Sequence, residues 1–505
     1  MTKVQVVLGE SIGRVNANIF GHFIEHLGRC VYEGIYVGQE SKIPNTRGLR
    51  NDVIEALKRI GPSVLRWPGG CFADDYHWRD GIGRRDERPR TVNINWGSTV
   101  EPNDFGTHEF IDFCRLIGAE PYICANVGSG SPQEARDWVE YCNFAGDSSL
   151  AQLRQENGSE EPFNVKYWGI GNELWGCGGS LPPDDYAIEV RRFASFMRDF
   201  GGGGMYKIAC GPRGNDPCTV RRDWVLKFFE KMQIDTLSDG CRSRIDGFAL
   251  HYYTRGDGGG GATDFTEHQY YWLLNQALGM EGRIRQVRTA MDVYDPDRKV
   301  GLVIDEWGSW HPEAKGDTGL EQQNTMRDAL VAALQLDIFI RHADKVVMTN
   351  IAQTVNVLQS LILTKEDKML LTPTYHVFDM YKRHSEGMSV RILIDSKEVQ
   401  SSENGDSVRV PQIAGAASVR DEELFVTLTN SDISNECEVE LELLGVSPSA
   451  VQQVELHQLV SSDARDHNTF ANQEKVTPQT RVFRWGKEPL ILPPHSVTAM
   501  TLKLK

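Results

Sequence analysis

Residues 165–173, "VKYWGIGNE", form an apolar run that ends on an amide and a carboxylate. Similar short runs recur between residues 18 and 352, usually followed by a loop and a helical pattern; they are "NIFGHF", "PSVLRW", "EPYICANV", "MYKIACGP", "IDGFALHYY", "KVGLVIDEW" and "DKVVMTNIA". Continuous apolar runs, rather than alternating ones, are typical of parallel strands that are buried on both faces. Eight strand–helix units predict an α/β fold with a closed (β/α)8 TIM barrel. A doubly wound open sheet is the alternative, but no glycine-rich phosphate turn follows the first run.

Amphipathic stretches separate these runs. In "NDVIEALKRIG", residues 51–61, apolar side chains form one stripe, and Gly61 supplies a helix stop. Longer stretches of the same pattern cover 183–201 and 321–343. The glycine tracts 201–204 and 256–261 fit neither the P-loop nor the dinucleotide spacing, and we interpret them as loops.

The pattern changes after about residue 385. "MSVRILID", "ASVRDEELFVTLTNSD", "CEVELELLG", "VQQVELHQLV" and "HSVTAMTLKLK" alternate apolar and polar residues, with turn residues between them. This alternation predicts a C-terminal antiparallel β-sandwich, and the strand-like "TKVQVVLG" at the N-terminus is expected to join it. The predicted domains are therefore a catalytic barrel over 18–385 and a sandwich, jelly-roll-like, made of 1–17 plus 386–505.

Composition argues against several classes of partner. A net charge of −16 opposes binding to nucleic acid or to an anionic membrane, because both surfaces would repel the chain. No stretch approaches the ~18 uninterrupted apolar residues of a transmembrane helix, and the N-terminus shows no apolar signal segment. The 10 cysteines are scattered without a C-x-x-C pair. This spacing favours a reduced, cytoplasmic chain over a disulfide framework or a zinc ribbon.

Two glutamates stand where apolar runs end. If 166–171 is the fourth barrel strand, Glu173 lies at the C-terminal face of the barrel, where such folds place their chemistry. The seventh run likewise ends on a carboxylate, Glu306. Such a pair can cleave a glycosidic bond, because one group protonates the leaving oxygen while the other, ionised, attacks the anomeric carbon. Asn172 offers an amide to a sugar hydroxyl, and Tyr253 can donate a hydrogen bond that keeps the nucleophile charged. Surface loop glutamates are the plain alternative, and the repetition at two strand ends argues against it.

Longer segments carry a resemblance to a known family. "GHFIEHLGRCVYEGIYVG", "LRWPGGCFADDYHWRDGIG", "GIGNELWG", "LHYYT", "IDEWGSW" and "IAQTVNVLQ" occur in this order between about residues 16 and 385. They resemble the α-L-arabinofuranosidases of glycoside hydrolase family 51. The resemblance implies a retaining double displacement, without metal or cofactor, that releases terminal non-reducing α-L-arabinofuranosyl residues from arabinan, arabinoxylan or derived oligosaccharides. It also implies a homohexamer and a part in arabinan catabolism.

The resemblance assigns roles residue by residue. Glu173 matches the general acid/base, Glu306 the nucleophile, and Glu25 the family's sugar-binding glutamate. The further positions that match the arabinose pocket or its surroundings are Cys71, Asn172, Tyr253, Gln353, Arg66, Trp96 and Trp310.

Several of these positions also have plainer interpretations. Arg66 is expected to support the nucleophile, and a structural ion pair is the alternative. Cys71 is interpreted as a small residue with a useful backbone N–H rather than a reactive thiol. Trp96 and Trp310 are expected to wall the leaving-group side, with a place in the core as the alternative. His251 is interpreted as structural and left out of the catalytic pair.

Three rival functions stay open. "HFIEH" formally matches a zinc hydrolase motif with His22, Glu25 and His26, but that chemistry needs a helix, and here the motif follows a strand-like segment. A retaining β-glucanase or xylanase could use the same barrel and glutamate pair. A non-catalytic sugar-binding protein would not require both glutamates. The loop 255–263 departs from the family pattern, so the aglycone preference stays open. The linkage that the enzyme prefers (1,2, 1,3 or 1,5) stays open too.

Overall fold

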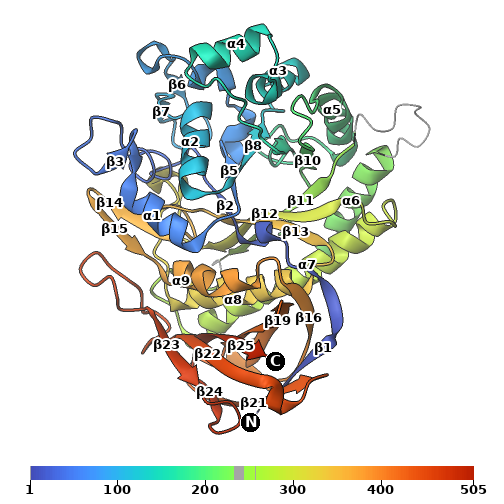
Figure 1. Cartoon of the computed structure of the whole chain (residues 1–505), viewed down its shortest axis with the longest axis vertical. Coiled ribbons are helices and arrows are strands. Elements are labelled where there is room, and N and C mark those ends of the chain that lie inside the picture. The colour runs from blue at the N-terminus through green and yellow to red at the C-terminus, as the bar shows by residue number, and fades with distance from the viewer. Residues whose placement is uncertain (1, 233–243, 256–257) are drawn as a thin grey trace.

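Eight parallel strands form a closed barrel, as the apolar runs predict. The computed structural model describes residues 2–232, 244–255 and 258–505 (Figure 1). The barrel strands in chain order are β2 (Gly21–Phe23), β5 (Val64–Trp67), β8 (Glu120–Ala125), β9 (Tyr167–Ile170), β10 (Tyr206–Ala209), β11 (Gly247–Arg255), β12 (Gly301–Trp310) and β13 (Val346–Ala352). Each strand pairs in parallel with the next, and β13 pairs with β2 to close the ring. The predicted barrel is therefore confirmed, and every strand lies within or overlaps its apolar run.

Helices surround the barrel. They are α1 (Asn51–Ile60), α2 (Thr107–Ile117), α3 (Pro132–Asn143), α4 (Ser149–Glu156), α5 (Pro183–Phe196), α6 (Cys218–Met232), α7 (Glu267–Asp292), α8 (Met326–Arg341) and α9 (Pro373–Tyr381). Short 3-10 turns are η1 (Ala17–Phe20), η2 (Cys71–Asp74), η3 (Trp78–Gly81), η4 (Arg85–Glu87), η5 (Gly316–Thr318), η6 (Lys382–His384) and η7 (Pro448–Ala450). Helix α1 ends where the sequence predicts, because Gly61 adopts φ 64°, a left-handed conformation that terminates helices. No helix of the described residues is both long enough and apolar enough to cross a membrane.

A second sheet follows the barrel, and its strand order is β23-β22-β25-β20-β19-β16-β1-β21-β24. Its strands are β1 (Thr2–Arg14), β16 (Met388–Asp395), β19 (Ile413–Arg420), β20 (Glu423–Asn430), β21 (Cys437–Leu444), β22 (Val451–Leu459), β23 (Pro478–Phe483), β24 (Leu490–Leu492) and β25 (Ser496–Leu504). The N-terminal strand joins this sheet as predicted, antiparallel to β16 and parallel to β21. This confirms a barrel followed by a β domain. The boundaries 18–385 and 1–17 with 386–505 stay a proposal, which the pairing of β1 with β16 supports.

Helix α8 lies between the barrel and the second sheet (Figure 1). Every side chain from Met326 to Ile340 is buried, as expected for a helix that is covered on all sides. Two hydrogen bonds join it to the sheet: Thr427 Oγ1 donates to Asp337 Oδ1 at 2.6 Å, and Arg341 Nη1 donates to the carbonyl oxygen of Gly415 at 2.7 Å. Burial raises the pKa of Asp337 to about 7. Polar contacts of α8 therefore connect the barrel domain to the second sheet.

Four hairpins were not predicted. They are β3 (Asn45–Thr46) with β4 (Leu49–Arg50), β6 (Thr91–Val92) with β7 (Val100–Glu101), β14 (Ile362–Lys365) with β15 (Lys368–Leu371), and β17 (Glu398–Glu403) with β18 (Asp406–Pro411). The β6–β7 hairpin matters for function, because its turn carries Trp96. The tract 201–204 is a loop as predicted. Residues 256–257 of the second glycine tract lie outside the described residues.

Candidate active site

A pocket of about 170 Å³ opens at the C-terminal ends of the barrel strands. Most predicted site residues line it, namely Glu25, Cys71, Trp96, Glu173, Tyr253, Glu306, Trp310 and Gln353. The other two, Arg66 and Asn172, are buried and bound to each other, since Arg66 Nη2 donates to Asn172 Oδ1 at 2.5 Å. An engineered cavity of about 150 Å³ holds one benzene ring. A space of this size therefore suits a single five-membered sugar ring rather than a chain.

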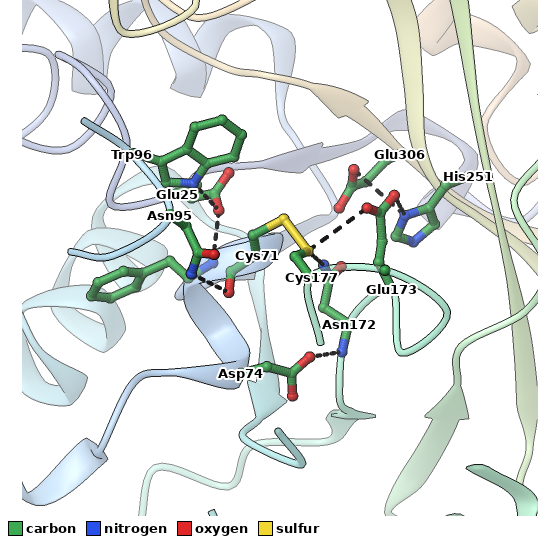
Figure 2. The surroundings of a disulfide bond; sticks show 12 residues. Glu25, Cys71, Asp74, Asn95, Trp96, Asn172, Glu173, Cys177, His251 and Glu306 are labelled. Carbon is green, nitrogen blue, oxygen red and sulfur yellow. Dashed lines mark hydrogen bonds and ion pairs between the residues drawn. A yellow bond between two sulfur atoms is a disulfide. The ribbon is translucent and has the colours of Figure 1, made fainter. Parts of the chain in front are cut away.

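Glu173 and Glu306 meet at the imidazole of His251 (Figure 2). Nδ1 of His251 lies 2.9 Å from Glu173 Oε1 and 3.5 Å from Glu306 Oε2. One oxygen of each carboxylate and one ring nitrogen all lie within 4.8 Å of one another. A retaining pair of carboxyl groups stands about 5–5.5 Å apart, whereas an inverting pair stands about 6.5–9.5 Å apart. The short separation favours retention, and His251, left out by sequence analysis, belongs to the site.

Glu306 is held as an anion. Arg66 Nη1 donates to its Oε1 at 2.8 Å, and the Tyr253 hydroxyl donates to its Oε2 at 2.7 Å. Burial by itself would raise the pKa of Glu306, but His251, Arg66 and Tyr253 together hold that pKa below its usual value. Nε of Arg66 also lies 3.4 Å from Asp305 Oδ2, so the structural ion pair and the support of Glu306 coexist. A buried carboxylate that stays ionised suits a nucleophile.

Backbone contacts fix the segment that carries Glu173. The backbone N–H of Asn172 donates to Asp74 Oδ2 at 2.7 Å, and the N–H of Gly176 donates to the Glu173 carbonyl at 2.7 Å. Gly171 has φ 76° and Glu173 has φ 44°, a left-handed conformation that is uncommon for a residue with a side chain. Asp74 is a site residue that the sequence does not predict, since nothing local marks an aspartate whose partner lies 98 residues away. A tight turn thus aims Glu173 back into the pocket.

Glu25 lies on the other side of the pocket from Glu173 and His251 (Figure 2). Its Oε1 accepts hydrogen bonds from the Phe72 backbone N–H at 3.1 Å and from Trp96 Nε1 at 3.0 Å, and its Oε2 accepts one from Gln353 Nε2 at 3.1 Å. Burial raises the pKa of Glu25 to about 7. Trp96 therefore touches the predicted sugar-binding glutamate directly. A Cβ on Gly69 would lie 2.6 Å from Glu25 Cγ, which explains why this turn carries a glycine.

A disulfide between Cys71, which lines the pocket, and Cys177 corrects one prediction (Figure 2). Cys71 and Cys177, 106 residues apart, are bonded at 2.07 Å, so the expectation of a wholly reduced chain is wrong for this pair. Sγ of Cys177 lies 3.9 Å from Glu173 Oε2. The bond joins the turn after β5 to the Glu173 segment, and it also removes Cys71 as a free thiol. The spacing of the cysteines could not reveal a pair that only the fold brings together.

The zinc hydrolase alternative does not fit this geometry. His22 lies on β2, packs its ring 5.2 Å from that of Phe378, and has its pKa lowered to about 3 by burial. His26 lies 2.9 Å from Glu101 through Nδ1, and its Nε2 accepts a hydrogen bond from Trp67 Nε1. The two histidines therefore do not share a helical face, as that motif requires. Among the described residues, neither group able to hold a metal includes them.

Known proteins match this chain along nearly all of its length. Residues 56–203 match the family described as "Alpha-L-arabinofuranosidase 1 domain", and residues 305–496 match "Alpha-L-arabinofuranosidase C-terminal domain". An intracellular exo-alpha-L-arabinofuranosidase of Bacteroides ovatus is 42% identical over 496 residues, which cover 96% of this chain and 92% of that protein. The crystal structure of a GH51 arabinofuranosidase from Xanthomonas axonopodis pv. citri has a TM-score of 0.92 and 39% identity, with 100% of both chains covered. An arabinose complex of the α-L-arabinofuranosidase from Thermotoga maritima has a TM-score of 0.87 and 32% identity, also over 100% of both chains.

Proposed function

Because the chain belongs to the α-L-arabinofuranosidases of glycoside hydrolase family 51, we propose that Glu306 and Glu173 are the two groups with which it cleaves the arabinofuranosyl bond. The enzyme is a glycoside hydrolase that acts from the non-reducing end with retention. One observation carries the assignment of the residues: the two carboxylates lie within 4.8 Å in a pocket fit for one sugar ring. A pocket of that size suits one terminal sugar rather than several consecutive units of a β-glucan or xylan chain.

The proposed reaction has two displacements. In the first, ionised Glu306 attacks the anomeric carbon while Glu173 gives its proton to the glycosidic oxygen, and the leaving group departs as an alcohol. In the second, Glu173 takes a proton from water, the water oxygen attacks the same carbon, and the bond to Glu306 breaks. Arabinose leaves with its original configuration, and both carboxyl groups return to their starting state.

The opposite end of the pocket is proposed to hold the sugar. Glu25 and Gln353 form a hydrogen-bonded pair there, and Gln353 Oε1 is buried without a hydrogen-bond donor among the described residues. A buried acceptor with no partner is costly, and a sugar hydroxyl would satisfy it. Asn172 Nδ2 lies 4.0 Å from the sulfur of Cys177, which is a weak acceptor, so this amide can also donate to a hydroxyl.

Product stereochemistry tests the assignment. We expect proton NMR of early reaction mixtures to show the α-anomer of arabinofuranose, or in methanol the methyl α-L-arabinofuranoside, before mutarotation. The short carboxylate separation supports this expectation, because an inverting pair stands further apart to leave room for the attacking water. The β-anomer as first product would reject the double displacement.

His251 is proposed to position both glutamates and to lower the pKa of Glu306. Burial alone would lower the pKa of His251, but Glu306 and Glu173 raise it above its ordinary value, so the ring gains positive charge beside Glu306. His251→Asn keeps a neutral polar group and removes that charge. The pKa of Glu306 should then rise, and the acidic limb of the kcat/KM profile should move to higher pH by about one unit. The exposed His77→Asn is the control; an unmoved limb in His251→Asn would show a structural role only.

Assembly and location are proposed from the same relationship. The Bacteroides ovatus relative is named intracellular, and we extend a cytoplasmic location to this chain, with arabinan, arabinoxylan or their oligosaccharides as substrates. A homohexamer is proposed as well, because the family resemblance implies it. The disulfide Cys71–Cys177 weakens the argument that the cysteines indicate a reducing compartment. The proposal of a cytoplasmic location therefore rests on the Bacteroides ovatus relative.

A further inference from the structure

Two arginines line the pocket close to its mouth. Arg255 ends β11, and Arg213 lies in the segment after β10. Each guanidinium lies over a tryptophan ring: Arg255 stands 4.7 Å from the centre of Trp310, and Arg213 stands 5.7 Å from the centre of Trp175. Arginines stacked on aromatic rings hold their planar donor groups in a fixed direction.

The fold positions both arginines. Arg255 is opposite Trp310 in the register of β11 and β12. Arg213 forms a parallel bridge with His251, and the N–H of the following Gly214 donates to the His251 carbonyl at 2.8 Å. The Arg213 segment is thus bound along the edge of the strand whose histidine contacts Glu173. Both cations therefore lie at the C-terminal end of the barrel strands.

Within the part of the chain that the structure describes, neither arginine has a carboxylate partner. Among the described residues, no Asp or Glu oxygen lies within 4.0 Å of either guanidinium, although the chain has 70 acidic and 54 basic residues. Nε of Arg255 is buried and has no hydrogen-bond acceptor in residues 2–232, 244–255 and 258–505. By contrast, Arg66 beneath the same pocket binds two carboxylates and an amide. Unused donors of this kind suit an anion that arrives from outside.

The leaving group is the part of the substrate that reaches them. Glu173 protonates the leaving oxygen, Trp175 follows Glu173 by two residues, and Arg213 covers Trp175. Glu25 and Gln353, which hold the sugar, bind to each other at the other end. The aglycone therefore leaves past the two arginines.

We propose that Arg213 and Arg255 bind a carboxylate on the aglycone, so that the enzyme favours arabinofuranosyl residues attached to a uronic acid or a similarly acidic saccharide. This rests on the proposed function of Glu173 and Glu306. A rival interpretation is that the two cations only offset the charge of the pocket carboxylates. In that case, their loss would change the hydrolysis of neutral and acidic substrates by the same factor.

Two matched substrates separate these interpretations. 4-(Carboxymethyl)phenyl and 4-(carbamoylmethyl)phenyl α-L-arabinofuranoside have the same shape, and the methylene group insulates the phenolic oxygen from the charge. We expect the wild-type enzyme to favour the carboxylate by about fivefold or more in kcat/KM at low salt, and the preference to shrink in 1 M NaCl, where the Debye length is about 3 Å. If the enzyme hydrolyses neither substrate, the proposed function itself is contradicted. If it hydrolyses both substrates equally well, only the carboxylate site is overturned.

Variants of the two arginines complete the test. Arg213→Gln and Arg255→Gln should each lower the carboxylate-to-amide ratio about threefold, and the double variant should bring it near unity. Arg222→Gln, on the exposed face of α6 beside Asp223, is the matched control and should keep the ratio. Arg213→Glu should instead favour a 4-(aminomethyl)phenyl substrate. A ratio that stays at the wild-type value in the double variant would overturn the proposal.

Discussion

Replacing Glu306 by alanine should lower kcat for every α-L-arabinofuranoside by about four orders of magnitude or more, which corresponds to about 5.5 kcal/mol of transition-state stabilisation. The loss should not depend on how good the leaving group is, because without a nucleophile neither displacement can begin. Steady-state rates with an activated aryl arabinofuranoside and with an unactivated oligosaccharide measure this. A residual rate that differs sharply between the two substrates would contradict the role.

Covalent trapping gives the same assignment a positive signal. A fluorinated or epoxide-like arabinose analogue that forms the intermediate faster than it is hydrolysed should add its mass to a peptide that contains Glu306. The carboxylate is prepared for this step, because Arg66 and Tyr253 hold one oxygen each and keep it ionised. Labelling of another residue in the wild-type enzyme would overturn the assignment. Circular dichroism controls for folding, since Glu306→Ala leaves Arg66 with Asp305 as its remaining anion.

The barrel could be predicted because most residues of its strands are buried, whichever face they point to. Such strands must be apolar throughout, so β9 and β12 stand out as runs, and a carboxylate that follows or interrupts the run stands out too. The exact ends were less predictable. Strand β12 continues four residues beyond Glu306, because the segment from Trp307 to Trp310 keeps pairing with β11. Glu306 therefore projects from within a strand, whereas Glu173 follows one.

The rest of the site depends on contacts between distant residues, which no local pattern encodes. Cys71 and Cys177 look like unrelated cysteines until the β5 and β9 loops meet. His251 looks like any histidine of a buried strand until Glu173 and Glu306 converge on it. Asp74 is marked only by the backbone N–H groups that it binds. The short hairpins escaped prediction for a related reason, since two to six residues hold too few side chains to show a period.

Replacing Glu173 by alanine should affect substrates unequally. Hydrolysis of an unactivated oligosaccharide should fall by about 10²–10⁴-fold, because its leaving oxygen needs a proton. An aryl arabinofuranoside with a good leaving group should still form the intermediate, which then waits for water that no base activates, so both kcat and KM should fall. The control is Glu156→Ala on α4, an exposed residue that does not line the pocket. Equal losses with both substrates would contradict an acid/base role.

Azide then tells the two glutamates apart by the configuration of the product. In Glu173→Ala, azide can enter the space of the lost carboxylate and attack the intermediate on Glu306 from the face that the leaving group has vacated, which gives the α-azide. In Glu306→Ala, azide can only replace the nucleophile and attack from the opposite face, which gives the β-azide. The prediction follows from the proposed roles, because in a double displacement the nucleophile and the leaving group stand on opposite faces of the sugar carbon, and the two carboxylates lie close enough to serve one sugar. The same azide configuration from both variants, or the two configurations exchanged, would show that the roles of Glu173 and Glu306 are wrongly assigned.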